Sequence, residues 1–176
     1  AETVLRKGVA LYPRSTRIHG LLIQVLGYYL GRFEDSLPLC EAGCALPTAG
    51  ADIVGDYAYA LGALGRADDA KEQARLALER DEDGDALAVE FHFYLYALTV
   101  GEDREARLRE LRALLDQDTR TEDWNFGPII ATAARLGHPE IDWLEALARV
   151  ANGQPDATTL AGWLAWNHAG PRSASE

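Results

Sequence analysis

The feature that most constrains the fold of this chain is a repeat of about 35 residues. Residues 30–36 read LGRFEDS, and residues 64–70, which lie 34 positions further on, read LGRADDA. Related versions follow at residues 100–106 and 136–139, each after another 36 positions. A period of this length is typical of chains built from stacked supersecondary units rather than from one irregular core. The markers of the repeat are Gly31, Gly65, Gly101 and Gly137.

Each repeat unit is predicted to be a pair of helices. Between residues 68 and 81, the apolar positions Ala70, Ala74 and Leu78 recur at helical spacing. A glycine after the first helix suits a left-handed helix stop, and the acids that follow it favour the start of the second helix. No segment shows sustained alternation of apolar and polar residues, so strands are not predicted.

The repeats predict one helical array over residues 1–169 and a small, polar, disordered tail over 170–176. Residues 1–12 read as the second helix of a repeat whose first helix is missing, which predicts that the chain was excised from a longer array or a multidomain protein. The predicted repeats span about 15–48, 50–83, 84–118 and 122–152. Their helices are predicted at 15–30 with 33–46, 50–64 with 67–81, 84–100 with 102–117, and 122–136 with 139–152, followed by a last helix at 156–168.

Small residues in the second helices point to a known family. Ser36, Ala70 and Ala106 lie one helical turn into these helices, and a further small residue follows seven positions later in each, so neighbouring helices are expected to pack closely there. Together with the helix-turn-helix period, this pattern resembles the tetratricopeptide repeat (TPR) family, most clearly over residues 15–118. The resemblance implies a right-handed α-solenoid, with a concave groove lined by the first helix of each pair.

Carried onto this chain, the resemblance implies a groove that binds a peptide or a protein. The lysine, asparagine and arginine residues with which family members clamp a terminal carboxylate are missing, so a partner with apolar side chains and a basic residue near Asp52 and Asp56 fits better. The tyrosines could instead pack between repeats. The candidate groove residues are Tyr28, Tyr29, Asp52, Asp56, Tyr59, His92, Tyr96, Trp124 and Arg135.

The charge and the cysteines limit the classes of partner and the compartment. A net charge of −11 repels phosphate backbones and anionic lipid, so neither nucleic acid nor a membrane surface is an expected partner. No apolar run reaches the roughly 18–20 residues that span a bilayer. Cys40 and Cys44 are predicted to be core residues of one helix face, which favours a reducing, cytoplasmic location.

No pattern typical of catalysis stands out. The four histidines are scattered, and the chain has no zinc-binding helix motif, no nucleophile elbow and no glycine-rich phosphate loop. We therefore expect no enzyme activity, no metal and no cofactor, and we expect the histidines to have structural roles. Trp163 and Trp166 could close the end of the array or form a patch that pairs with another chain.

The leading functional hypothesis is therefore a protein–protein interaction scaffold that binds a partner in its groove. One alternative is a regulatory or sensor segment of a longer multidomain protein whose catalytic part is absent here. Self-association through the terminal repeats is a further possibility, and a stand-alone helical enzyme is the least favoured.

Overall fold

The computed structural model describes residues 1–81, 87–115 and 124–154, and the regular elements among them are all helical. The predicted all-α class is confirmed. The elements are α1 (Glu2–Leu11), α2 (Thr16–Gln24), the π-helical segment η1 (Val25–Tyr29), α3 (Phe33–Cys44), α4 (Ala51–Ala63), α5 (Ala67–Arg80), α6 (Leu87–Ala97), α7 (Arg104–Leu115), α8 (Gly127–Arg135) and α9 (Ile141–Ala151).

These helices agree with the predicted ones to within a few residues. The largest difference is at α8, which was predicted from residue 122 and begins at Gly127. Pro128 in its first turn fits this start, because proline lacks an amide hydrogen and is best tolerated in a helix at the first turn. The predicted helix at 156–168, with Trp163 and Trp166, and the predicted tail at 170–176 lie outside the described residues.

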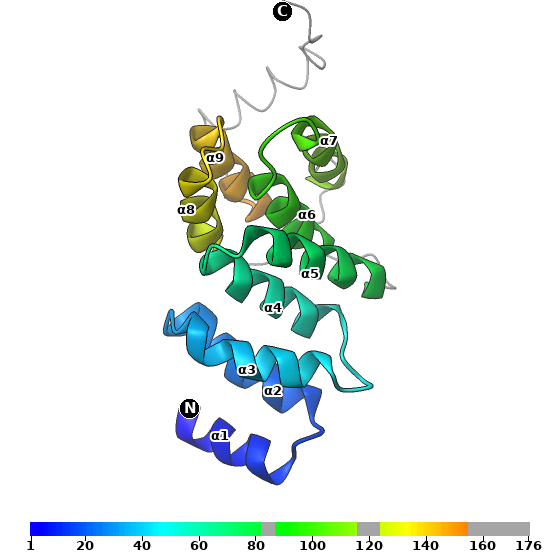
Figure 1. Cartoon of the computed structure of the whole chain (residues 1–176), viewed down its shortest axis with the longest axis vertical. Helices are drawn as coiled ribbons and strands as arrows, with labels where there is room; N and C mark the ends of the chain where they lie inside the picture. The colour runs from blue at the N-terminus through cyan, green and yellow to red at the C-terminus, as the bar shows by residue number, and fades with distance from the viewer. Residues whose placement is uncertain (82–86, 116–123, 155–176) are drawn as a thin grey trace, which may run out of the picture.

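Successive helices pack against one another from α1 to α7, with α1 at one end of the molecule (Figure 1). The helices form hairpins: α2 and η1 pair with α3, α4 pairs with α5, α6 with α7, and α8 with α9. The first helices of neighbouring hairpins also touch, since α2 packs on α4 and α4 packs on α6. The second helices α3 and α5 each lie between two first helices. The first helices therefore form a continuous layer through the first three hairpins.

Gly31, Gly65 and Gly137 end their first helices as predicted, whereas α6 already ends at Ala97, before Gly101. Gly31, Gly65, Gly101 and Gly137 all have positive φ angles, from 63° to 124°. After α4, the amide of Gly65 donates to the Gly62 carbonyl and the amide of Arg66 donates to the Leu61 carbonyl. This pair of bonds is a Schellman motif, which satisfies carbonyls that the helix end leaves free. The turn after α8 repeats it at Gly137 and His138.

The small residues of the second helices pack as predicted in two hairpins and not in the third. Ser36 and Gly43 on α3 are buried, as are Ala70 and Ala77 on α5. On α7, by contrast, Ala106 is only half-buried and Ala113 is exposed. The prediction of close packing at these two positions is wrong, because α7 packs chiefly against its own partner α6 among the described helices.

The fourth hairpin departs from a regular array. In such an array each unit contacts only its neighbours, yet α8 packs on α4 as well as on α6. The buried Thr132 hydroxyl donates to the Gly62 carbonyl at 2.7 Å, and Phe126 stacks on Phe93 with ring centroids 4.0 Å apart. The α8–α9 hairpin thus packs against α6 and reaches back to α4 (Figure 1).

A glycine pair tests this account of the helix stops. Gly137 has a φ of 77° and nothing within 4 Å of an added Cβ, so Gly137→Ala changes backbone strain alone. We expect a loss of about 1–2 kcal/mol of unfolding free energy. The matched control Gly20→Ala lies inside α2, where its Cβ would make an ordinary 3.8 Å contact, and we expect a gain of up to about 1 kcal/mol from helix propensity. Urea unfolding measures both, and an equal effect of the two substitutions would contradict the left-handed stop.

Candidate functional site

The most unusual chemistry in the described residues is a group of acids and tyrosines on the layer of first helices. It consists of Tyr28 from η1, Asp56 and Tyr59 from α4, and Glu90 and Tyr94 from α6, and we call it the acid–tyrosine cluster. All of its members except the half-buried Tyr28 are at most 8% exposed. Three successive hairpins therefore contribute side chains to one buried polar group.

Glu90 is the hydrogen-bonding centre of the cluster. The Tyr28 hydroxyl donates to Glu90 Oε1 at 2.6 Å, and the Tyr94 hydroxyl donates to the same oxygen. The two hydroxyl oxygens also lie 3.3 Å apart. Burial, followed by the neighbouring Glu90 charge, raises the pKa of both Tyr28 and Tyr94 well above the ordinary value. Both phenols therefore stay protonated and remain donors.

The tyrosine rings form a stack across the three hairpins. The Tyr28 and Tyr59 rings are nearly parallel, with centroids 4.2 Å apart, and Tyr59 stacks in turn on Tyr94 at 6.0 Å. Phe33 meets the edge of Tyr59. The Tyr59 hydroxyl is buried and has no hydrogen-bond partner among the described residues. Its desolvation is a cost to the fold that packing of the rings offsets.

Asp56 is the least satisfied member. Its Oδ2 atom is buried without a hydrogen-bond partner in the described part of the chain. Burial is the largest cause that raises the pKa of Asp56 well above 3.8, and the charges of Glu90 and Asp52 raise it further. Hydrogen bonding by the Gln24 amide lowers that pKa and opposes them. The charges acting on Asp56 are thus other carboxylates, and a cation at this point would relieve their repulsion.

The amino-acid sequence around the cluster contains no internal counterion. Residues 33–65, which include α3 and α4, hold five acids and neither lysine nor arginine. The nearest cations along the chain, Arg32 and Arg66, are each ion-paired with an acid three residues ahead. The helices α3 and α4 therefore contain acids but no basic residue of their own.

A π-helical turn positions Tyr28. The helix that begins as α2 widens into a π-helical turn over Val25–Tyr29. A hydrogen bond from the Arg32 amide to the Leu26 carbonyl, 2.8 Å long, closes the end of this helix. Such turns are rare and frequently lie at functional sites, because the extra residue re-aims the side chains around it. Here Tyr28 turns in toward Tyr59 and Glu90, whereas its neighbour Tyr29 points away and is 80% exposed.

Two predicted groove residues prove to be core residues. Tyr59 is 1% exposed and Tyr96 is 0% exposed, so their predicted place on an open groove is wrong. Tyr59 is enclosed between Tyr28 and Tyr94. Tyr96 is covered by the turn between α8 and α9, where its hydroxyl donates to Glu140 at 2.8 Å and its ring meets His138 edge-on. Both tyrosines pack between hairpins, which is the other reading that the sequence allowed.

Three other predicted groove residues lie apart from the cluster. His92 faces α7, with Nδ1 3.6 Å from Glu110, so it belongs to its own hairpin and not to a groove. Trp124 precedes α8 and is 9% exposed; its backbone amide and carbonyl both bond to the Asn152 side chain. Arg135 is exposed beside the contact between α8 and α4, where it reaches the Ala63 carbonyl. Of the nine predicted residues, four gather at one place: Tyr28, Asp52, Asp56 and Tyr59.

Glu90, Tyr94 and Gln24 were not identified from the sequence. Glu90 carried the clearest signal, because it is the single acid in the apolar run from Leu87 to Leu98. A lone acid in such a run must be paired or functional once buried. Tyr94 gave no distinct signal, because residues 94–98 (YLYAL) resemble residues 57–61 (YAYAL), in which the Tyr57 hydroxyl reaches Glu41 instead. Gln24 gave no signal, because its role depends on α2 lying against α4.

The sequence analysis also considered metal-binding residues, the two cysteines and membrane-spanning segments. Within residues 1–81, 87–115 and 124–154, no group of three or more His, Cys, Asp or Glu is arranged to hold a metal ion. Cys40 is buried and Cys44 is half-buried, and both are free thiols. Burial raises the pKa of Cys44 to about 11, so that thiol stays protonated. None of the described helices combines the length and the apolar character needed to cross a membrane.

Comparison with known proteins adds no relative to this picture. The sequence matches no protein-family model, and neither the curated proteins nor the solved structures yield a match.

The raised pKa of Asp56 makes stability depend on pH. Because the folded protein holds this proton to higher pH than the unfolded chain, Asp56 lowers stability as pH rises from about 4 through its folded pKa. Asp56→Asn removes the charge, so we expect the variant to be more stable than the wild type at neutral pH by about 1–3 kcal/mol. Urea unfolding across this pH range measures the difference.

Comparing the variant with the wild type separates the contribution of Asp56 to the pH dependence of stability from that of the histidines. Burial lowers the pKa of His92 and of His138, and these groups reduce stability as pH falls in both proteins alike. We expect the two stability curves to converge below about pH 4, where Asp56 is protonated in both states. A variant that is no more stable than wild type at neutral pH would show that the carboxylate is compensated.

Proposed function

We propose that this chain is a TPR-like interaction module, a short right-handed α-solenoid that binds a peptide or protein partner through a basic side chain. The observation that carries the proposal is Asp56, a buried carboxylate with an unpartnered oxygen whose neighbouring charges are Asp52 and Glu90. Leaving such a group unpaired costs the fold stability. A lysine or arginine from a partner supplies the missing counterion, so binding recovers part of that cost.

The surface beside the cluster suits a peptide. On α2, Leu21 and Gln24 are exposed, and the Gln24 side chain hydrogen-bonds Asp56 of the cluster. On α4, the exposed Asp52 lies one turn before Asp56. This arrangement provides an apolar contact, a polar amide and two acids in a small area. An apolar residue next to a basic one in the partner matches it.

The position of the fourth hairpin limits the size of the partner surface. Because α8 packs on α4 and α6, the ends of these helices near Gly62 and Tyr96 are covered by this chain itself. The open part of the first-helix layer is thus confined to α2 and the start of α4. We infer a short linear contact rather than a segment that runs the whole length of the array.

The free thiols fit the compartment that we propose. Cys40 and Cys44 lie one turn apart on α3 and form no disulfide in the described residues, which suits a reducing, cytoplasmic setting. The net charge of the chain is −11. This charge attracts basic peptides and repels the phosphate backbone of nucleic acid.

A random-peptide library displayed on phage tests the proposal. Panned against the intact wild-type chain, the library is expected to become enriched in peptides with lysine or arginine next to an apolar residue. The double variant Asp52→Asn, Asp56→Asn should lose this enrichment and bind the selected peptides at least about tenfold more weakly. Fluorescence anisotropy with a synthetic copy of a selected peptide measures the affinity.

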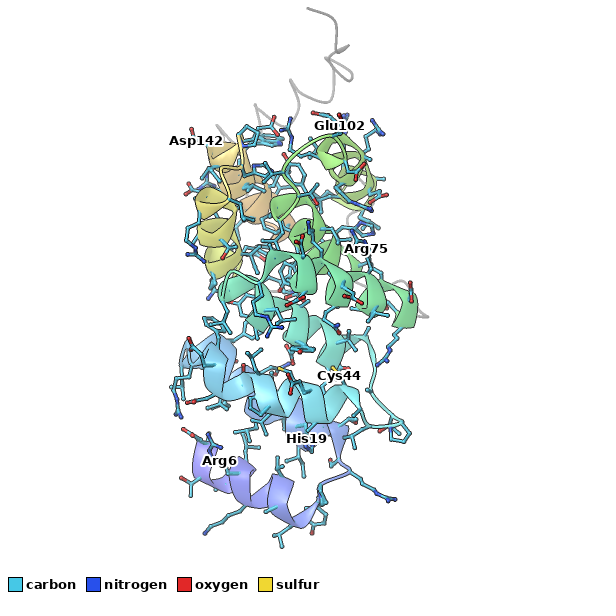
Figure 2. All side chains as sticks on the ribbon, viewed as in Figure 1. Arg6, His19, Cys44, Arg75, Glu102 and Asp142 are labelled. Carbon is cyan, nitrogen blue, oxygen red and sulfur yellow. The ribbon has the colours of Figure 1, made fainter. Side chains whose placement is uncertain are left out.

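A matched control separates the site from overall charge. Asp142 is an exposed carboxylate in the first turn of α9, far from α2 (Figure 2), so Asp142→Asn should bind the peptide as the wild type does. The proposal is wrong if the selected peptides show no excess of basic residues, or if Asp142→Asn weakens binding as much as the double variant. Circular dichroism confirms that each variant is folded.

A further inference from the structure

A second surface lies at the end of the molecule formed by α1, and it is independent of the acid–tyrosine cluster. Val4 is 72% exposed and Leu11 is 73% exposed, although both are large aliphatic residues. Together with Lys7 they follow the i, i+3, i+7 spacing of one helical stripe. Tyr12, which directly follows the helix, is also exposed. We call this stripe with Tyr12 and Arg14 the α1 face.

The inner side of α1 is already occupied. Leu5, Gly8 and Val9 are partly buried, and α1 packs on α2 so closely that a Cβ on Gly8 would lie 3.1 Å from Ile18. The apolar residues of the α1 face are therefore not needed for that contact. They leave a second apolar side on a ten-residue helix.

In the interior of the molecule, two second helices are each covered by a helix on both sides. The helix α3 lies between α2 and α4, and α5 lies between α4 and α6. Among the described helices α1 packs chiefly on α2 alone (Figure 1). Terminal units of helical arrays keep a polar outer face in order to stay soluble. Since the α1 face is apolar, it has the properties of an interior helix that packs against another helix.

The charge of residues 1–21 indicates which kind of helix would bind the α1 face. Residues 1–21 carry four cationic side chains and one carboxylate, a net charge of +3, whereas the whole chain carries −11. The one carboxylate, Glu2, is paired with Arg6 and Arg32. Lys7 and Arg14 form no ion pair within the described residues. This end is thus a basic patch on an acidic protein, and it attracts an acidic partner.

We propose that the α1 face docks an acidic amphipathic helix of a partner protein. The apolar stripe of that helix packs on Val4, Leu11 and Tyr12, and its carboxylates pair with Lys7 and Arg14. Docking in a helix-on-helix manner is an established mode of peptide recognition. Pairing two copies of the chain through this face would oppose cation to cation, so charge disfavours a symmetric dimer.

Two model peptides test this proposal on the intact chain. Both are about five helical turns long with leucine along one face, and they differ in carrying either glutamate or lysine at the remaining positions. We expect the glutamate peptide to bind at least about tenfold more tightly than the lysine peptide at low ionic strength, and to weaken in about 0.3 M salt. Anisotropy of a labelled peptide measures both affinities.

The residues of the α1 face are exposed, so they can be substituted without disturbing the core. Val4→Asp with Leu11→Asp places acids on the face without disturbing the core, and should reduce binding of the glutamate peptide at least about tenfold. The matched control, Val100→Asp with Leu136→Asp, alters two other exposed aliphatic residues and should leave it unchanged. Lys7→Glu with Arg14→Glu should reverse the preference between the two peptides.

Three outcomes would overturn the proposal. One is equal binding of the two peptides, and another is a control pair that weakens binding as much as the α1 variant does. The third is sedimentation showing a wild-type dimer that Val4→Asp with Leu11→Asp dissociates, since the face would then belong to a second copy. Failure here leaves the acid–tyrosine cluster untouched, because its test uses basic peptides and different residues.

Discussion

The hydrogen bond from Tyr28 of the first hairpin to the Glu90 carboxylate on α6, together with the ring of Tyr59 on α4, ties the first helices of three hairpins together. Tyr28 reaches the carboxylate from the first hairpin and Tyr94 from the third, while Tyr59 of the second packs between their rings. Helical hairpins of this size cannot bury an apolar face alone. In this chain the layer of first helices is therefore joined through a polar centre with aromatic walls, and the relative placement of α2, α4 and α6 follows from it.

This arrangement carries an energetic conflict. The rings and hydroxyls stabilise the layer, yet Asp56 and the Tyr59 hydroxyl are buried with unmet hydrogen-bonding capacity. A chain selected only for stability would replace them with apolar residues of similar size. Their presence beside the open surface of α2 and the acidic start of α4, where Asp52 is exposed, is what links the fold to binding. The proposed α1 face adds the opposite charge on the neighbouring end of the molecule, so the two proposals assign one surface to basic partners and another to acidic ones.

Local chemistry made much of the fold predictable from the sequence. Glycines with positive φ and the acids after them act within a few residues, so the hairpins and their boundaries could be placed. The site was harder, because Glu90 meets Tyr28 across 62 positions and no local pattern records that contact. The π turn at Val25–Tyr29 shifts the register of the helix end, and the return of α8 onto α4 buries Tyr96. Neither event leaves a periodic signal in the sequence.

The most direct test of the central claim is the pKa of Asp56 itself, followed by carboxyl-carbon NMR in the free protein and with a bound basic peptide. In the free protein, burial and the charges of Glu90 and Asp52 should hold this pKa well above its ordinary value. A lysine or arginine that enters the site should then lower it, as a new counterion does. An ordinary pKa in the free protein, or a raised one that the bound peptide leaves unchanged, would contradict the account.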